Sequence, residues 1–326
     1  MPEAIGGYFE LELRSGQHPY PQAKAFNSAR SAFRALMQAR DLRRVHLPHY
    51  ICAVLEQALA GLDIEVCRYT LDAELSLAAL PDVAADEGLL YVDYFGLKAD
   101  YVRRVLAPRY GQQLIIDNSQ ALFSQALPGI ATLYSPRKFV GVADGGWLVN
   151  GPARMPEAQP SASRYRFAAL LGRLEQSAEQ HYNEYQANEA ALAEQGVRAM
   201  SASTARILDS IDYASVADRR RNNLSLLRER LDGCNRFSAW PGELPAALCY
   251  PLLLDSPAQA NHLRRHLLDQ AIYVPCYWRE LIDNPTTPAL ERHLAECLLP
   301  LPMDQRYGAT DMHRLADAVI LHMRTP

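Results

Sequence analysis

The chain has 326 residues, of which 49% are hydrophobic and 21% charged, and its formal net charge is −4. This length favours more than one domain, and the negative charge argues against a nucleic-acid partner, because phosphate binding needs a basic surface. No apolar run approaches the ~18 residues that cross a bilayer, and the N-terminus lacks a signal-peptide pattern, so we expect a cytoplasmic protein without a membrane anchor.

Cysteine and lysine are used in ways that narrow the possible chemistry. The six cysteines lie far apart without a C-x-x-C pair, which indicates reduced thiols rather than a disulfide framework or a zinc site. Of the 33 lysine and arginine residues, only Lys24, Lys98 and Lys138 are lysine. Any chemistry that needs a lysine amine therefore has three candidates.

The first half of the chain alternates helical and extended patterns. Apolar residues at i, i+3 and i+4 spacing predict a helix over residues 28–40 and a second that ends at Gly61. Apolar runs predict strands at residues 45–47, 64–69, 89–95, 114–116, 130–134 and 147–149. Because these runs are continuous rather than alternating, we expect strands covered on both faces, as in an α/β protein with a mostly parallel sheet.

The second half has a different character. Residues 151–163 are rich in Pro, Ala and Ser and predict a loop, and two long helices are expected at residues 165–199 and 205–231. The tail predicts β-α-β-like pieces, with strands at 247–254 and 272–274 and helices at 259–270 and 311–323. We therefore expect a large α/β domain over residues 1–230 and a small C-terminal α+β domain over residues 231–326.

Three segments place polar residues where such folds bind ligands. Ser28, Ala29 and Arg30 open a helix, whose free backbone N–H groups favour a phosphate, although a plain N-cap at Ser28 is the simpler interpretation. Asp117 ends a buried strand, at the edge where open α/β sheets bind ligands and where an aspartate is as often a helix cap. Lys138 follows another strand and has apolar neighbours, unlike the usual solvated lysine.

The order of these segments resembles the DegT/DnrJ/EryC1/StrS family of sugar aminotransferases, which depend on pyridoxal 5′-phosphate (PLP). The resemblance rests on the small-residue helix start, on LPHY before a helix, and on the segments IIDNSQA and SPRKFVGVADGGWLV. It is strongest over residues 24–150. It implies the PLP-dependent transferase type I fold, with a large PLP-binding α/β domain, a small C-terminal domain and a homodimer.

The resemblance also assigns roles to individual residues. Lys138 corresponds to the lysine that forms the Schiff base with PLP and moves the proton. Asp117 corresponds to the acid at the pyridine nitrogen, and Gln120 to the residue that hydrogen-bonds the 3-oxygen of the ring. The phosphate-binding pair maps onto Ala29 and Arg30, next to Ser28.

Two positions depart from the family pattern. The aromatic residue that stacks on the PLP ring in the family is Cys52 here, so we expect Tyr50 to stack instead. A serine that contacts the phosphate in the family is Leu133 here, so Ser135 or Thr132 would substitute for it.

These assignments predict a PLP-dependent aminotransferase. Its substrates would be an amino-acid donor and a keto-sugar nucleotide or a related small ketone. A PLP-dependent dehydratase, or another reaction at Cα, is an alternative, and so is a non-catalytic subunit with the same fold. The presence of both Lys138 and Asp117 argues against the non-catalytic subunit, because a scaffold does not need the pair.

Other features have simpler interpretations. His262 and His266 share a helical face, but no third ligand has a recognisable spacing, so we expect no metal site. The run Arg219–Arg221 is interpreted as a solvated helix face. Residues 165–199 contain more apolar and aromatic side chains than one outer helix needs for its own packing, which favours a homodimer interface.

Overall fold

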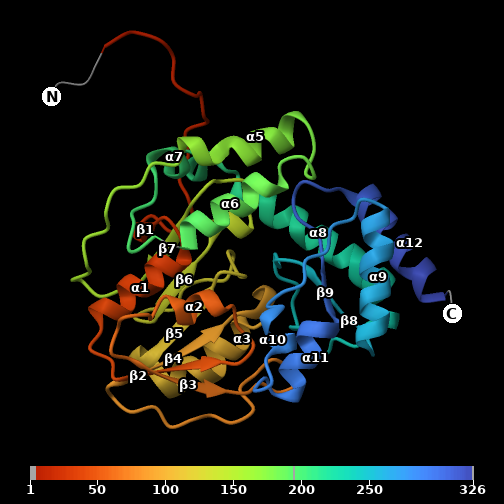
Figure 1. Ribbon diagram of the computed structural model, residues 1–326, viewed down its shortest axis with the longest axis horizontal. Helices are drawn as coiled ribbons and strands as arrows, with labels where there is room; N and C mark the ends of the chain where they lie inside the picture. The colour runs from red at the N-terminus through yellow and green to blue at the C-terminus, as the bar shows by residue number, and fades with distance from the viewer. Residues whose placement is uncertain (1–4, 194, 325–326) are drawn as a thin grey trace.

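A seven-stranded sheet forms the first half of the chain in the computed structural model, which describes residues 5–193 and 195–324 (Figure 1). In spatial order its strands are β1 (Lys24–Phe26), β7 (Gly146–Val149), β6 (Ala131–Tyr134), β5 (Leu114–Asn118), β4 (Glu87–Val92), β2 (Arg44–Pro48) and β3 (Glu65–Tyr69). Strands β2 to β6 pair in parallel, whereas β7 is antiparallel to both of its neighbours. The predicted α/β fold with a mostly parallel sheet is confirmed.

The strands predicted in the first half of the chain are all present, and the one expected at residues 89–95 ends early. The run expected at residues 89–95 stops being a strand at Val92, and Tyr94–Gly96 forms a 3-10 turn. Phe95 in this turn has φ of 59°, a left-handed conformation that no strand tolerates. The strand β1 was not predicted, because only three residues form it.

Helix α1 (Ala29–Ala39) covers one face of this sheet next to β7, and α2 (Ala53–Gln57) follows β2 (Figure 1). The side chain of Ser28 is the N-cap of α1, and its Oγ accepts a hydrogen bond from Ser31 N at 3.1 Å. Between β4 and β5 lie two short helices, α3 (Ala99–Tyr101) and α4 (Ala107–Tyr110). The predicted first helix and its cap are therefore confirmed.

The two long helices expected in the middle of the chain are both broken, so those predictions were wrong in length. The first region forms α5 (Ala168–Glu175) and α6 (Tyr182–Ala193), and the second forms α7 (Ala202–Ser210) and α8 (Tyr213–Leu231). Ser201 and Asp212 accept hydrogen bonds from backbone N–H groups of α7 and α8, respectively. Each side chain starts a new helix in this way, and the cap at Asp212 explains why the second predicted helix is interrupted between α7 and α8.

The C-terminal part contains a two-stranded antiparallel sheet, β8 (Tyr250–Leu253) and β9 (Leu298–Leu301). Its helices are α9 (Pro257–Asp269), α10 (Glu280–Asp283), α11 (Ala289–Cys297) and α12 (Ala309–Arg324). The strand expected at residues 272–274 is absent: the chain leaves α9 through Ala271, with φ of 58°, and Ile272 N still bonds to Leu267 O. The partner of β8 is β9 instead.

The buried core is continuous between the two sheets. One apolar cluster includes Phe33 on α1, Leu227 on α8 and Leu299 on β9, all of them inaccessible to solvent. The domain boundary at residue 230 stays a prediction. Among the described residues, no helix combines the length and the apolar character that crossing a membrane requires.

Candidate functional site

Asp117 lies near the carboxyl end of β5, and only 6% of its surface is exposed. Its Oδ1 accepts a hydrogen bond from Ser119 N at 2.8 Å, so the turn after the strand holds the carboxylate. The strands β4 and β6 flank it in parallel. A buried acid therefore stands at the sheet edge where open α/β folds bind ligands, as predicted.

Gln120 follows on the same turn and connects it to the turn after β4. Its Oε1 accepts a hydrogen bond from Phe95 N at 2.9 Å, and the side chain is 3% exposed. Because this bond uses the oxygen of the amide, the NH₂ end is the part that remains for a ligand. That end is a donor, which a ring oxygen requires.

Lys138 ends a 3-10 turn, Pro136–Lys138, that follows β6 directly. The turn is closed by a hydrogen bond from Lys138 N to the carbonyl of the buried Ser135, at 3.1 Å. The side chain of Lys138 is exposed, and no hydrogen bond or ion pair joins its Nζ to a residue that the structure describes. The Nζ atoms of Lys24 and Lys98 both donate to backbone carbonyls, so Lys138 is the lysine with a free amine.

The strand register brings these two segments to the same edge. Strands β5 and β6 are parallel neighbours, with Asp117 opposite Leu133. The turn that ends at Lys138 therefore leaves the sheet beside the turn that follows Asp117. Residues that are far apart in sequence become neighbours because the carboxyl ends of parallel strands meet at one edge.

The start of α1 joins the same edge through the loop that follows Lys138. Gly145 N donates to Asn27 O at 2.6 Å, and the backbone of Ser28 pairs with Gly145. A Cβ atom at Gly146 would lie 2.2 Å from the carbonyl carbon of Ser28, so only glycine fits there. The structure thus brings together the three segments that the sequence singled out.

The guanidinium group of Arg30 lies close to this helix start without a counter-ion. Its Nε and Nη1 atoms are buried and have no hydrogen-bond partner among the described residues. Burial lowers the pKa of Arg30, and the nearby Cys52 partly offsets that effect. Buried donors without acceptors are costly, so this corner of the site suits an anion such as a phosphate.

Sequence reasoning missed two further arginines of this kind, Arg137 and Arg166. Each has a buried guanidinium nitrogen without a hydrogen-bond partner among the described residues. The position of Arg137 directly before Lys138 was the one available signal, whereas nothing local distinguishes Arg166 from its arginine neighbours. These residues show that the site residues fit a phosphorylated cofactor.

Tyr50, the predicted stacking residue, is buried in an aromatic cluster and is 1% exposed. Its ring lies 4.3 Å from that of Trp278, nearly perpendicular to it, and 5.7 Å from that of Tyr94. Its carbonyl accepts a hydrogen bond from the Tyr94 hydroxyl at 2.7 Å. Stacking on a cofactor stays a prediction for Tyr50, and it requires the ring or its neighbours to move.

Arg220 is buried, so the interpretation of Arg219–Arg221 as a solvated face is wrong for the middle residue. Its Nη1 donates to the carbonyls of Ala247 and Leu248, each at 3.1 Å, and Nη2 lies 3.4 Å from the carbonyl of Phe139. The guanidinium also lies over the Phe139 ring, 4.7 Å from its centre. It therefore anchors the backbone next to Lys138.

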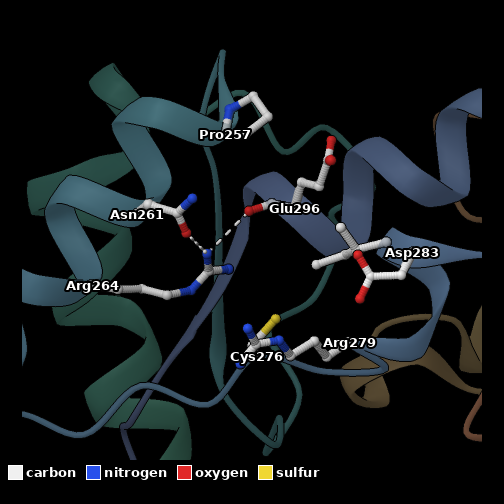
Figure 2. A pocket seen from close by; sticks show the side chains of 8 residues that line it. Pro257, Asn261, Arg264, Cys276, Arg279, Asp283 and Glu296 are labelled. Atoms are coloured by element: carbon white, nitrogen blue, oxygen red, sulfur yellow. Dashed lines mark hydrogen bonds between the residues drawn. The ribbon is translucent and has the colours of Figure 1, made fainter.

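Two cavities lie outside this edge. One of about 300 Å³ is in the C-terminal part, where Arg264 donates to Asn261 Oδ1 and to the carbonyl of Glu296 (Figure 2). A second of about 330 Å³ is lined by residues that include Asp93, Asn118 and Ser124. Thr132, the alternative to Ser135 for the phosphate contact, lines the second cavity, and the other predicted site residues line neither.

Asp93, which lines the second cavity, is 1% exposed. Its carboxylate accepts hydrogen bonds from Lys98 N at 2.7 Å and from Ser124 Oγ at 2.6 Å. Burial raises its pKa to about 6, although both hydrogen bonds oppose the shift. This carboxyl group is a buried titratable group that the candidate site does not use.

Comparison with known proteins relates the fold to solved structures. No protein-family model and no curated protein sequence matches the chain. The crystal structure of S. venezuelae DesV in complex with a ketimine intermediate is similar with a TM-score of 0.66 and 18% identity, over 93% of this chain and 85% of that chain. A DegT DnrJ EryC1 StrS aminotransferase from Brucella abortus is similar with a TM-score of 0.62 and 17% identity, over 91% of this chain and 85% of that chain.

The sugar aminotransferase CalS13 from Micromonospora echinospora is similar with a TM-score of 0.61 and 16% identity, over 92% of this chain and 87% of that chain. The similarity spans nearly the whole of each chain, including the C-terminal part. The chain therefore has the fold of these sugar aminotransferases, the type I fold of PLP-dependent transferases.

Proposed function

We propose that the protein is a PLP-dependent aminotransferase that moves an amino group from an amino-acid donor to a keto-sugar nucleotide or a related small ketone. The observation that carries the proposal is the free amine of Lys138 at the sheet edge where Asp117 is buried. Likeness to sugar aminotransferases such as CalS13 supports this reaction class.

Each residue of the site has a task that its geometry supports. PLP, when bound, supplies a ring that withdraws electrons from the carbon that carries the amino group. Asp117 would hold a proton at the pyridine nitrogen, since its carboxylate is buried at the strand end. The NH₂ end of Gln120 would donate to the 3-oxygen, and Lys138 Nζ would bind the cofactor and move the proton at Cα.

The phosphate end of the cofactor would lie at the start of α1. Ser28 and Ala29 are buried there, at 8% and 9% exposure, beside the unpartnered guanidinium of Arg30. The helix dipole adds a partial positive charge at this point. Ser135, buried at 6% exposure at the end of β6, would take the place of the family serine that is Leu133 here.

A second copy of the chain would complete the functional unit. Helices α5 and α6 lie together above the sheet in the view of Figure 1 and expose large apolar side chains. These are Leu171, Leu174, Tyr182 and Tyr185, with Tyr165 just before α5. Single exposed apolar residues are ordinary, but such a group favours an interface, and a two-fold dimer is the commonest way to cover it.

The expected cytoplasmic location is part of the same proposal. All six cysteines are free thiols in the structure. Reduced thiols are typical of a compartment kept reducing by glutathione and thioredoxin.

An absorbance spectrum of the purified protein with PLP tests the reaction class. We expect a visible band that candidate amino-acid donors convert to an ultraviolet band, and that a keto-sugar nucleotide restores. Mass spectrometry should then detect the amino sugar. A protein that binds PLP but leaves the band unchanged with every donor would contradict an aminotransferase. Lys138→Ala is the matched control and should show no visible band.

A further inference from the structure

Three arginines beside the candidate site have buried guanidinium nitrogens that form no hydrogen bond to any residue that the structure describes. The atoms are Nε and Nη1 of Arg30, Nε of Arg137 and Nη1 of Arg166. They belong to the first turn of α1, to the turn that ends at Lys138, and to the 3-10 turn before α5. Buried polar groups are nearly always paired, so a set of unpaired guanidinium nitrogens at one place indicates a missing acceptor.

Arg30 and Arg166 are each close enough to Arg137 to affect the pKa of its guanidinium group. Burial lowers the pKa of Arg137, and the positive charges of Arg30 and Arg166 lower it further, against the raising effects of Tyr185 and Asp144. The side chain of Arg137 is 15% exposed. Like charges held together in a partly buried place repel, so the arrangement would be unfavourable unless an anion joins it.

The carboxylates nearby do not neutralise this charge. Glu189 on α6 pairs with Nη2 of Arg137 and is itself 40% exposed. Asp144 is fully buried, and its two oxygens accept hydrogen bonds from Ser201 N and Oγ. Three guanidinium charges thus face two carboxylates.

The start of α1 adds to the excess of positive charge. This helix has 11 residues and no acidic side chain in its first turn. Its N-terminus contributes about half a positive charge to the same place. A phosphate monoester, with close to two negative charges and three oxygens that can each accept more than one hydrogen bond, suits this excess of positive charge and these four free donor nitrogens.

We propose that the guanidinium groups of Arg30, Arg137 and Arg166 bind the 5′-phosphate of PLP. In this chain they would act together with Ser135, which takes the place of the family serine that is Leu133 here. The proposal rests on the proposed function, since it concerns the cofactor of that reaction. A nucleotide sugar has the same phosphate chemistry, but Arg137 adjoins Lys138 and Arg30 lies in the first turn of α1, which places the anion at the cofactor.

Comparison of PLP with pyridoxal, which lacks the phosphate, tests this assignment without measuring activity. Dissociation constants of both compounds are obtained by absorbance titration of the full-length apoprotein. Arg30→Gln, Arg137→Gln and Arg166→Gln should each weaken PLP binding roughly 10- to 100-fold, the scale of one charged hydrogen bond. Pyridoxal binding should stay within about twofold, so the preference for PLP shrinks. Arg137→Lys keeps a positive charge and should retain part of the preference for PLP over pyridoxal.

Two variants separate phosphate binding from a purely structural role. Glu189→Gln breaks the ion pair of Arg137 but keeps the guanidinium, so PLP affinity should stay or rise if Arg137 serves the phosphate. Arg34→Gln removes another guanidinium of α1, one that donates to the carbonyls of Ala58 and Ala60 at 2.7 and 2.9 Å. Its ratio of PLP to pyridoxal affinity should match that of the wild type.

The outcomes are distinct. If the arginine variants weaken the binding of PLP and of pyridoxal equally, the arginines are structural and the proposal is overturned. The same conclusion follows if Glu189→Gln loses as much PLP affinity as Arg137→Gln. If the wild type binds uridine diphosphate through these arginines while PLP binds equally well to all variants, the anion belongs to the substrate. Wild-type protein that binds neither PLP nor pyridoxal would instead overturn the proposed function itself.

Discussion

Gln305 donates its side-chain amide to the carbonyl of Phe139 across 2.7 Å and so ties the C-terminal part of the chain to the residue after Lys138. The Oε1 atom of Gln305 accepts from Nε of Arg220 at 3.0 Å, and Arg220 also reaches the Phe139 carbonyl. The two side chains form a bridge between the C-terminal part and the turn that carries the lysine. Both side chains therefore hold the backbone carbonyl of Phe139, the residue after Lys138.

Removal of this bridge should destabilise the protein. Arg220→Met leaves the carbonyls of Ala247 and Leu248 buried without a donor, and we expect the free energy of unfolding to fall by about 2–4 kcal/mol. Urea denaturation followed by circular dichroism measures it. Arg221→Met, an exposed neighbour whose Nη1 pairs with Asp218, is the matched control and should change little. Equal midpoints for the two variants would contradict the anchoring role of Arg220.

Borohydride reduction should fix PLP on Lys138. Its amine is free, whereas Lys24 and Lys98 use theirs in hydrogen bonds to backbone carbonyls. Lys98 is the competitor to exclude, because burial lowers the pKa of its amine and so favours the nucleophilic form. Peptide mapping by mass spectrometry decides between them: label on Lys98 or Lys24 would refute the assignment of Lys138.

Asp117→Asn should keep the fold and most of the PLP binding but lower turnover. The neutral amide cannot hold a proton at the pyridine nitrogen, and loss of one such electrostatic stabiliser costs about 100- to 1,000-fold in kcat. Steady-state kinetics with the identified donor measures the effect, and the hydrogen bond from Ser119 N can persist in the variant. An Asp117→Asn enzyme with wild-type kcat would remove the basis for the proposed mechanism.

The buried carboxyl group of Asp93 should make the free energy of unfolding fall as the pH is raised from about 4 to about 6. Its pKa is raised to about 6 from 3.8, so the folded state binds the proton more tightly than the unfolded state does. That contribution is fully present at low pH and is lost as the pH rises through about 6. A shift of this size corresponds to roughly 3 kcal/mol.

Asp93→Asn isolates this effect from the other carboxylates. Relative to the wild type, the variant should gain stability by up to roughly 3 kcal/mol as the pH is raised from 4 to 7. Urea unfolding at several pH values measures the difference. A difference between the two proteins that does not change with pH would show that Asp93 titrates normally.

The apolar surface of α5 should hold two copies of the chain together. Light scattering at micromolar concentration should give twice the mass of one chain. Leu171→Glu with Leu174→Glu should shift the protein to monomer, because the side chains are 52% and 82% exposed in one subunit. Leu268→Glu on α9, at 56% exposure, is the control and should stay dimeric. A wild-type monomer that turns over substrate would show that the site is self-contained.

Much of the large sheet could be predicted from local sequence. Continuous apolar runs identify its strands, because a strand covered on both faces has no polar alternation. Ser28 identified the start of α1, because its hydroxyl caps the helix within three residues. Asp117 and Lys138 were found from motif order, since Asp117 lies near the end of one buried strand and Lys138 follows the next strand after a short turn.

The remaining features depend on contacts that local sequence does not encode. The partner of β8 lies more than forty residues away along the chain, so β9 was missed and a false strand was expected at residues 272–274. In the sequence Arg220 is one of three consecutive arginines that look equivalent. Carbonyl groups far from it along the chain, those of Phe139, Ala247 and Leu248, make it a buried anchor.

The sequence by itself determined the fold class and the candidate lysine and acid, because these depend on patterns within a few residues. Only the tertiary structure decided that Arg30 and Arg166 lie near Arg137 and that each of the three has a buried guanidinium nitrogen without a partner among the described residues. The physical reason is that burial and hydrogen-bond partners are properties of the whole packed chain. Whether a buried guanidinium group costs free energy depends on the groups that surround it, and those groups come from segments far apart in sequence.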